Sequence, residues 1–242
     1  AFSETGIANR FQVVEGRTRI NVKLTEHTGA VTDFNFSGFS VTKADWQRFV
    51  TDSLSWAGQF DMICVSGSLP QGVDLKDFTQ WMLRLREQCM CVIFDSSREA
   101  FVAGLKASPW LVKPNHRELE IWAGKPLPTH QDIVDAANQL RQQGIAHVVV
   151  SLGEKGAMWV NSSGAWFAKP PECDVISTVG AGDSMVGGLI YGLMMRQTSE
   201  HTLRLATAIS ALAVSQPNVG ITDRAQLAHM MTKVDLQPFT AQ

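Results

Sequence analysis

The N-terminal part of the chain alternates between apolar and polar positions. Residues 17–24 and 31–36 alternate, a glycine-containing turn at 26–30 separates them, and residues 11–14 form a short apolar run before them. A period of two is the spacing of a strand with one buried face. The pattern therefore predicts a small β structure at about residues 11–38.

After residue 38, short apolar runs and helical periods take turns. Thr42 and Asp45 form a capping box ahead of apolar residues at helical spacing, which predicts a helix start. Helices are also predicted at residues 75–85, from 97, from 115 and at 129–143. Buried strands are predicted between them, at residues 62–65, 91–94, 110–112 and 147–150. Buried strands separated by helices are typical of a mainly parallel sheet covered on both faces, which makes a three-layer α/β fold.

The remaining C-terminal segments complete this prediction. Residues 158–160 and 166–168, joined by a polar turn, predict a hairpin at the edge of the sheet. The tail is predicted to be helical at 181–195, 199–215 and 224–233. Since the chain has no repeat and no low-complexity linker, residues 1–242 are predicted to form a single domain.

The amino-acid composition excludes several classes of protein. The 242 residues carry 21 basic and 23 acidic side chains, so bulk attraction to nucleic acid or to an anionic membrane is not expected. Four cysteines are too few for a disulfide framework, and no apolar run approaches the roughly 18 residues of a membrane helix. The expectation is a cytoplasmic protein without a nucleic-acid or membrane partner. Because residue 1 is alanine, processing or truncation remains open.

Candidate chemistry gathers in four loops that follow predicted strands, at 65–70, 113–118, 151–156 and 178–183. In open α/β sheets, ligands bind outside the carboxyl ends of the strands. The last loop places two glycines and Asp183 at the start of a long helix, where free N–H groups and the helix dipole favour an anion. A carboxylate beside such a site suits a base that takes a hydroxyl proton during phosphoryl transfer. The alternative is a tight turn with an acid that complements the dipole.

Rival phosphate and hydrolase motifs do not fit the sequence. The Gly124-Lys125 pair is followed by proline, so it is not the end of a Walker A loop. A dinucleotide fingerprint would need a third glycine where Met185 stands. Neither HExxH nor GxSxG occurs. The remaining loops have ordinary explanations as well, because Asn115 is a common helix cap, Glu118 a common first-turn acid, and Ser66 and Ser68 common turn residues.

Residues 177–188, with the sequence STVGAGDSMVGG, resemble the C-terminal pattern of the ribokinase-like (PfkB) sugar kinases. Lys113-Pro114-Asn115 with Glu118 is similar to that family's Asn-x-x-Glu motif, and residues 151–156 resemble its nucleotide-phosphate loop. The resemblance runs from residue 1 to about residue 239. It implies a ribokinase-like fold with a small β lid, ATP and Mg²⁺ as cofactors, and a sugar phosphate as acceptor.

The resemblance also implies a role for each matching residue. Asp183 would be the catalytic base, and Gly180, Ala181 and Gly182 the anion hole. The ATP site would include Lys113, Ser151, Leu152, Gly153, Glu154, Lys155, Gly156, Gly182, Asp183 and Asn218. The sugar phosphate would contact Arg19, Asn21, Ser68 and Asp183. Asn115 and Glu118 would organise Mg²⁺ through water. Without the resemblance, Arg19 and Lys23 would be interpreted as a solvated strand edge.

Several expectations of the resemblance concern the whole protein. Family members begin with a strand, part of the lid and a Gly-Gly-Lys segment that have no counterpart here, so a truncated chain is expected. Overall similarity favours fructose 1-phosphate as acceptor over fructose 6-phosphate or tagatose 6-phosphate. The alternative from another class is a non-catalytic domain that binds a nucleotide or sugar phosphate. Ile20, Val22 and Leu24 share one face of the lid, and covering that face predicts a homodimer.

Overall fold

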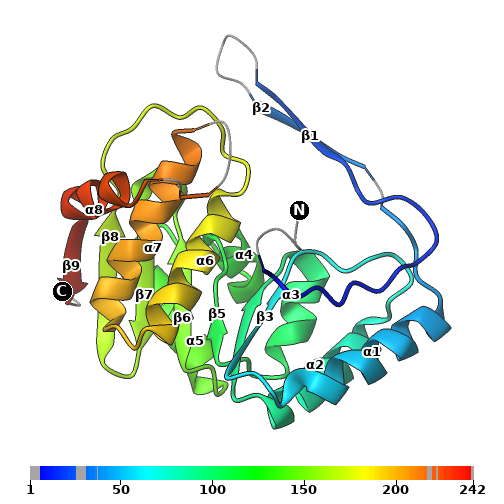
Figure 1. Cartoon of the computed structure of the whole chain (residues 1–242). Helices are drawn as coiled ribbons and strands as arrows, with labels where there is room; N and C mark the ends of the chain where they lie inside the picture. The colour runs from blue at the N-terminus through cyan, green and yellow to red at the C-terminus, as the bar shows by residue number, and fades with distance from the viewer. Residues whose placement is uncertain (1–5, 26–30, 37, 217–219, 222, 241–242) are drawn as a thin grey trace.

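The computed structural model describes residues 6–25, 31–36, 38–216, 220–221 and 223–240, and its centre is one seven-stranded sheet (Figure 1). The strand order follows the chain, from β3 at one edge to β9 at the other. The pairings among β3, β4, β5 and β6 are parallel, and those from β6 to β9 are antiparallel. The strands are β3 Met62–Ser66, β4 Cys91–Asp95, β5 Leu111–Val112, β6 His147–Ser151, β7 Ala157–Asn161, β8 Gly164–Lys169 and β9 Asp235–Phe239.

Helices cover both faces of the sheet, and this confirms the predicted three-layer α/β architecture. Neighbouring residues of β4 enter different cores: Val92 and Phe94 pack with the first group of helices, and Ile93 packs with the second. The first group is α1 Lys43–Ala57, α2 Leu75–Gln88, α3 Arg98–Leu105, α4 His116–Ala123 and α5 His130–Gln142. The second group is α6 Ala181–Met194, α7 Ser199–Val214 and α8 Arg224–Lys233.

The predicted capping box at the start of α1 is present. The Asp45 amide donates to the Thr42 hydroxyl at 3.1 Å, and the Thr42 amide donates to the Asp45 carboxylate at 3.0 Å. The Thr42 hydroxyl also donates to Asp45 Oδ2 at 2.6 Å. This bond, followed by the one from the Thr42 amide, holds the pKa of Asp45 below its usual value, because both favour the charged carboxylate. Local capping chemistry therefore sets this helix boundary, as the sequence predicts.

Two predictions about the sheet are wrong. The β7–β8 hairpin is not at the edge, because β9 pairs with β8 outside it. Residues 235–239 were not predicted as a strand, since they carry a proline and mostly polar neighbours. Pro238 is tolerated because an edge strand needs partners on one side only. The sheet is consequently mixed, with three parallel and three antiparallel pairings.

The N-terminal β structure is smaller than predicted. It is a two-stranded antiparallel ribbon of β1 Asn21–Thr25 and β2 Val31–Asn35, which stands away from the sheet in Figure 1. Residues 11–14 are not a strand. They contact α1 instead: Gln12 donates to the Asp45 carbonyl and Arg48 donates to the Val13 carbonyl. Residues 17–20 also precede the strand, and the predicted turn at 26–30 lies outside the described residues.

Close packing against α7 fixes the direction of α6. A Cβ at Gly188 would lie 2.7 Å from Ala206 Cα, and one at Gly192 would lie 2.6 Å from the Thr202 side chain. Such contacts are shorter than packed atoms tolerate, so only glycine permits this approach. The start of α6 is thereby held at the carboxyl end of the sheet, where the candidate site lies.

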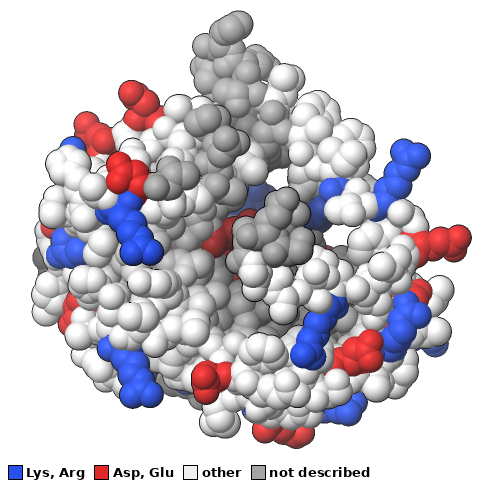
Figure 2. Space-filling model, in the orientation of Figure 1, with Lys and Arg blue, Asp and Glu red and all other residues white. Residues whose placement is uncertain are grey.

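Surface and cysteine features agree with the composition. On the face shown in Figure 2, Lys and Arg are interspersed with Asp and Glu instead of forming a patch of one sign. Cys64, Cys89, Cys91 and Cys173 are all free. Within the described ranges, no helix is both long and apolar enough to span a membrane.

Candidate active site

Backbone hydrogen bonds bring the predicted loops together at the carboxyl ends of the parallel strands. The Gly67 amide donates to the Asp95 carbonyl at 3.0 Å, and the Lys113 amide donates to the Phe94 carbonyl at 3.2 Å. The Ser151 amide donates to the Pro114 carbonyl at 3.1 Å. Because the four parallel strands end at the same edge, the loops after β3, β5 and β6 form one continuous border.

A buried ion pair lies within this border. Lys113 Nζ is 3.3 Å from Asp95 Oδ1, and Lys113 is only 5% exposed. The pKa of Asp95 lies above its usual value, mainly because the carboxyl is buried. The Lys113 charge opposes this rise, and the Asp183 charge adds to it. Sequence reasoning assigned Lys113 to ATP and missed Asp95. The available signal was that Asp95 directly follows an apolar run, as the loop residues of the other strands do.

The start of α6 adjoins this ion pair. Gly180 precedes the helix with φ +75°, a left-handed conformation that favours glycine, and as the N-cap residue it has no side chain with which to cap the first turn. A Cβ on Gly182 would lie 3.7 Å from Lys113 Nζ, so the helix start and the lysine are neighbours. Asp183 lies exposed in the same turn. The amides of 181–183, the helix dipole and a lysine together can hold an anion beside a carboxylate.

Asn115 and Glu118 form a complete capping box at the start of α4. The Glu118 amide donates to Asn115 Oδ1 at 2.9 Å, and the Asn115 amide donates to Glu118 Oε2 at 2.8 Å. Burial raises the pKa of Glu118, while the Asn115 hydrogen bond and the Lys113 charge lower it. Helix capping alone is therefore enough to explain why Asn115 and Glu118 occur at this helix start. Glu118 nevertheless shares its electrostatic surroundings with Lys113 and Asp95.

The two glycines of the 151–156 loop differ in whether the fold requires a glycine at their position. Gly156 has φ +116°, and a Cβ there would lie 2.1 Å from the Ala168 carbonyl oxygen, so the fold itself requires glycine. Gly153 has φ +63° and open space around its Cβ position. Leu152, Glu154 and Lys155 complete this turn, which includes the short 3₁₀ segment η1 Gly153–Lys155. Packing therefore accounts for Gly156 but not for Gly153, whose Cβ position lies in open space.

The ribbon reaches the site through Arg19. Its Nη1 donates to Ser68 Oγ at 2.5 Å, which joins two residues predicted to bind the sugar phosphate. Asn21 opens β1, two residues further along the ribbon. Asn218 lies outside the described residues, so its predicted position by the adenine has no structural test. The described site therefore brings together Arg19 with Ser68, and separately Lys113 with Asp95 and the α6 start.

The described part of the candidate site does not have enough side-chain ligands to hold a metal ion by themselves. Among the described residues, no group of three or more His, Cys, Asp or Glu side chains is placed to hold a metal ion. Glu118 uses Oε2 in the capping box, so Oε1 is the oxygen that can face a metal-bound water. The donor set fits a cation held by phosphate oxygens and water, which is how Mg²⁺ usually binds beside nucleotides.

An α/β sheet with a glycine at a helix N-cap, a buried lysine and neighbouring carboxylates at the strand ends is chemically suited to a phosphotransferase. Comparison with known proteins identifies its kind. Residues 1–225 match the model of the pfkB family of carbohydrate kinases. The chain belongs to this family, whose members transfer a phosphoryl group to an alcohol group of a sugar.

Individual relatives agree with the family. The chain is 77% identical to the 1-phosphofructokinase of Escherichia coli (strain K12), over 98% of this chain and 76% of that protein. It is 49% identical to the 1-phosphofructokinase of Haemophilus influenzae, over 97% of this chain and 75% of that protein. A solved structure of phosphofructokinase-2 from Escherichia coli in complex with potassium matches with a TM-score of 0.84 and 27% identity. That match covers 96% of this chain and 75% of the other.

Proposed function

We propose that the protein transfers the γ-phosphoryl group of ATP to fructose 1-phosphate, giving fructose 1,6-bisphosphate and ADP. The observation that carries this proposal is the 77% identity to a 1-phosphofructokinase along nearly the whole chain. The joined Arg19 and Ser68 support a phosphorylated acceptor, because a guanidinium beside a hydroxyl suits a phosphate.

Each residue has a role in the proposed mechanism. Asp183 accepts the proton of the acceptor hydroxyl as its oxygen forms a bond to the γ-phosphorus. The bond from that phosphorus to the β–γ bridging oxygen breaks, and ADP leaves with the electron pair. The first-turn amides of α6 and the Lys113 ammonium stabilise the charge on the transferred group. Positioning and charge neutralisation supply most of the catalysis in such reactions.

The residues that would hold Mg²⁺ are Asn115 and Glu118, acting through water. When bound, the cation neutralises charge on the phosphate oxygens. The Glu118 carboxylate would orient a metal-bound water through Oε1, while the capping box keeps the side chain in place. Burial raises the pKa of both Glu118 and Asp95, and the Lys113 charge opposes this rise in each.

The test of the proposed function is ADP release from Mg-ATP with each of three acceptors. Fructose 1-phosphate should give a kcat/KM well above those for fructose 6-phosphate and tagatose 6-phosphate. Preference for either 6-phosphate would reassign the acceptor. Acceptor-dependent ADP release that is absent for all three, with ATP still bound, would favour a non-catalytic binding domain instead.

We expect Glu118 to set the Mg²⁺ requirement. Glu118→Ala and Glu118→Gln should each raise the Mg²⁺ concentration for half-maximal rate by about 10–100-fold, as loss of an outer-sphere partner does. Asn115→Ala should raise it as well. Glutamine preserves an acceptor for the Asn115 amide, so it is the control for capping. A requirement raised in Glu118→Ala but normal in Glu118→Gln would show a helix cap and no metal role.

We infer that a homodimer covers the apolar face of the ribbon. Ile20 and Phe36 lie across the ribbon from each other, since the Phe36 amide donates to the Ile20 carbonyl at 3.2 Å, and Val22 pairs with Phe34. Their side chains are 45–65% exposed. A two-stranded ribbon is only marginally stable in water by itself. Contact between its apolar face and another protein surface would stabilise it. A second copy presents the same self-complementary face around a two-fold axis.

Sedimentation of single variants tests this dimer. Ile20→Asp should shift the protein toward monomer, because it places an unpaired charge within an apolar contact. Val13→Asp is the matched control, since Val13 is 86% exposed and lies outside the ribbon. A dimer that survives Ile20→Asp, or a protein that is monomeric before substitution, would assign the ribbon to another role.

A further inference from the structure

Asp95 and Lys113 occupy equivalent positions at the ends of two neighbouring parallel strands. In the register of the sheet, Ile93 of β4 pairs with Leu111 of β5, and both pack in the core that contains α6. Asp95 and Lys113 follow these two residues at the second position along the chain. Because side chains alternate between the faces of a strand, the acid and the lysine share the α6 face, where that core ends.

Stability alone does not explain an ion pair at this position. Lys113 Nζ lies 3.3 Å from Asp95 Oδ1, and the two side chains are only 6% and 16% exposed. The cost of removing two charges from water often equals or exceeds their attraction, so apolar residues of similar volume would serve the fold as well. Ile93 and Leu111 show that the same face of both strands accepts apolar residues. A function that requires a fixed ammonium group explains the pair better.

The lysine extends to the place where the proposed reaction occurs. A Cβ on Gly182 would lie 3.7 Å from Lys113 Nζ, an ordinary packing distance, so the ammonium lies against the first turn of α6. Asp183 is the next residue in that turn. An ammonium group carries three N–H donors, so a lysine that pairs with Asp95 can also donate to a phosphate oxygen.

Two further carboxylates lie within electrostatic range of the pair. The Lys113 charge acts on Glu118, and the Asp183 charge acts on Asp95. Because a lysine is a point charge on a long flexible stem, the carboxylate that it pairs with decides where the ammonium lies. Without the charge of Asp95, the other two carboxylates would draw the ammonium from its place beside Gly182.

We propose that Asp95 is a positioning residue for phosphoryl transfer, which holds the Lys113 ammonium against the first turn of α6, where it meets the oxygens of the transferred group. Asp95 acts through the lysine and takes no proton from the acceptor, which is the role of Asp183. This assignment rests on the proposed function. The ammonium stabilises charge that develops during transfer, so kcat should depend on Asp95 more than either KM does.

A double-mutant cycle measures whether Asp95 acts through Lys113. Lys113→Met should lower kcat by about 10²–10³, as loss of one charge-stabilising donor does. Asp95→Asn should lower kcat by about 10–100-fold, the effect of a small displacement of a catalytic group. The double variant should have the kcat of Lys113→Met, because Asp95 has no effect once the ammonium is gone. Losses that multiply in the double variant, or a full kcat in Asp95→Asn, would overturn the proposal.

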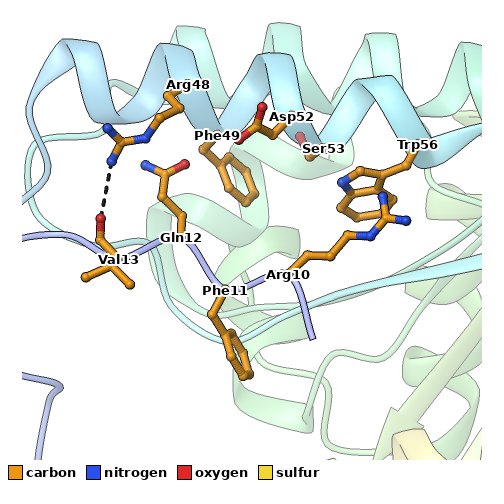
Figure 3. Close-up of a pocket in the computed structure, with 9 residues that line it drawn as sticks. All are labelled: Arg10, Phe11, Gln12, Val13, Arg48, Phe49, Asp52, Ser53 and Trp56. Atoms are coloured by element: carbon orange, nitrogen blue, oxygen red, sulfur yellow. Dashed lines mark hydrogen bonds between the residues drawn. The ribbon is translucent and has the colours of Figure 1, made fainter. Parts of the chain in front are cut away.

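Arg48→Met is the matched control for the loss of an ion pair. Arg48 pairs with Asp45 at 3.1 Å on α1, where its side chain is 53% exposed. Figure 3 shows Arg48 at the groove between residues 10–13 and α1, where it donates to the Val13 carbonyl. Since exposed pairs contribute little, turnover should equal that of the unsubstituted protein. A kcat loss as large as that of Asp95→Asn would attribute both losses to general damage and overturn the positioning role.

Two further measurements distinguish positioning from other roles of the acid. The Mg²⁺ concentration for half-maximal rate should be the same in Asp95→Asn and the parent, and a rise like that expected for Glu118→Gln would assign Asp95 to the cation and overturn the proposal. Should Asp95→Asn fail to fold, Asp95→Glu takes its place, because glutamate keeps the charge and displaces it by one carbon. Its kcat should fall with both KM values unchanged, and a full kcat would overturn the proposal.

A binding experiment separates this proposal from the choice of acceptor. ADP with Mg²⁺ and aluminium fluoride imitates the transferred phosphoryl group, whereas ADP with Mg²⁺ alone does not. By calorimetry, Asp95→Asn should bind the fluoride complex about tenfold more weakly than the parent and bind ADP equally well. Equal affinities of parent and variant for the fluoride complex would overturn the proposal. If the parent transfers phosphate to none of the three acceptors, the proposed function fails, while this comparison still decides the role of Asp95.

Discussion

Replacing Asp183 by asparagine should lower kcat by about 10²–10⁴, the usual effect of removing a general base, and leave the affinity for ATP nearly unchanged. Asp183 is exposed in the first turn of α6, beside the amides proposed to hold the transferred phosphoryl group. Asparagine keeps the size and polarity of the side chain but cannot accept the acceptor's proton. The measurement is steady-state turnover together with ATP binding by calorimetry.

Asp52→Asn is the matched control for this experiment, because Asp52 is an exposed carboxylate on α1, outside the strand-end loops. Its turnover should equal that of the unsubstituted protein. If Asp183→Asn retained more than half of the turnover, the carboxylate would be only a partner of the helix dipole. That outcome would show that the catalytic base was wrongly assigned to Asp183.

Local signals predicted most of the fold. The capping boxes at Thr42, Asn115 and Thr129 mark helix starts because their hydrogen bonds join residues three apart in the sequence. The four apolar runs became β3 to β6, since strands buried on both faces need continuous apolar residues. Such features depend on neighbours in the chain, so the sequence alone carries them.

Features that depend on distant partners were missed. β9 is a strand because β8 offers it an open edge, and its own residues show little strand pattern. Asp95 matters because Lys113 directly follows the neighbouring strand β5, and its Nζ lies 3.3 Å from Asp95 Oδ1. Conversely, Gly156 was assigned to ATP, although a backbone oxygen of β8 already requires a glycine there. A sequence pattern cannot tell a glycine required by packing from one required by a ligand.

Arg19→Ala should raise the KM for fructose 1-phosphate by about 10–100-fold, the effect of losing a hydrogen bond to a charged group, with little change in the KM for ATP. Arg19 lies just before β1 and packs closely against Gly38. A Cβ built on Gly38 would lie 3.1 Å from the Cβ of Arg19. The base of the side chain is thus held where the ribbon leaves the domain. From there the guanidinium reaches Ser68, so an acceptor phosphate at this point meets a positioned donor.

Two further variants separate recognition of the phosphate from simple loss of charge. Arg17→Ala removes an exposed arginine two residues earlier and should leave both KM values unchanged. Arg19→Lys keeps the charge but not the planar fork that matches phosphate oxygens, so its KM should fall between those of the parent and Arg19→Ala. Equal KM values for Arg19→Ala and the parent would leave Arg19 as a ribbon residue that merely touches Ser68. A rise that Arg19→Lys fully reverses would show that charge, without fork geometry, holds the sugar phosphate.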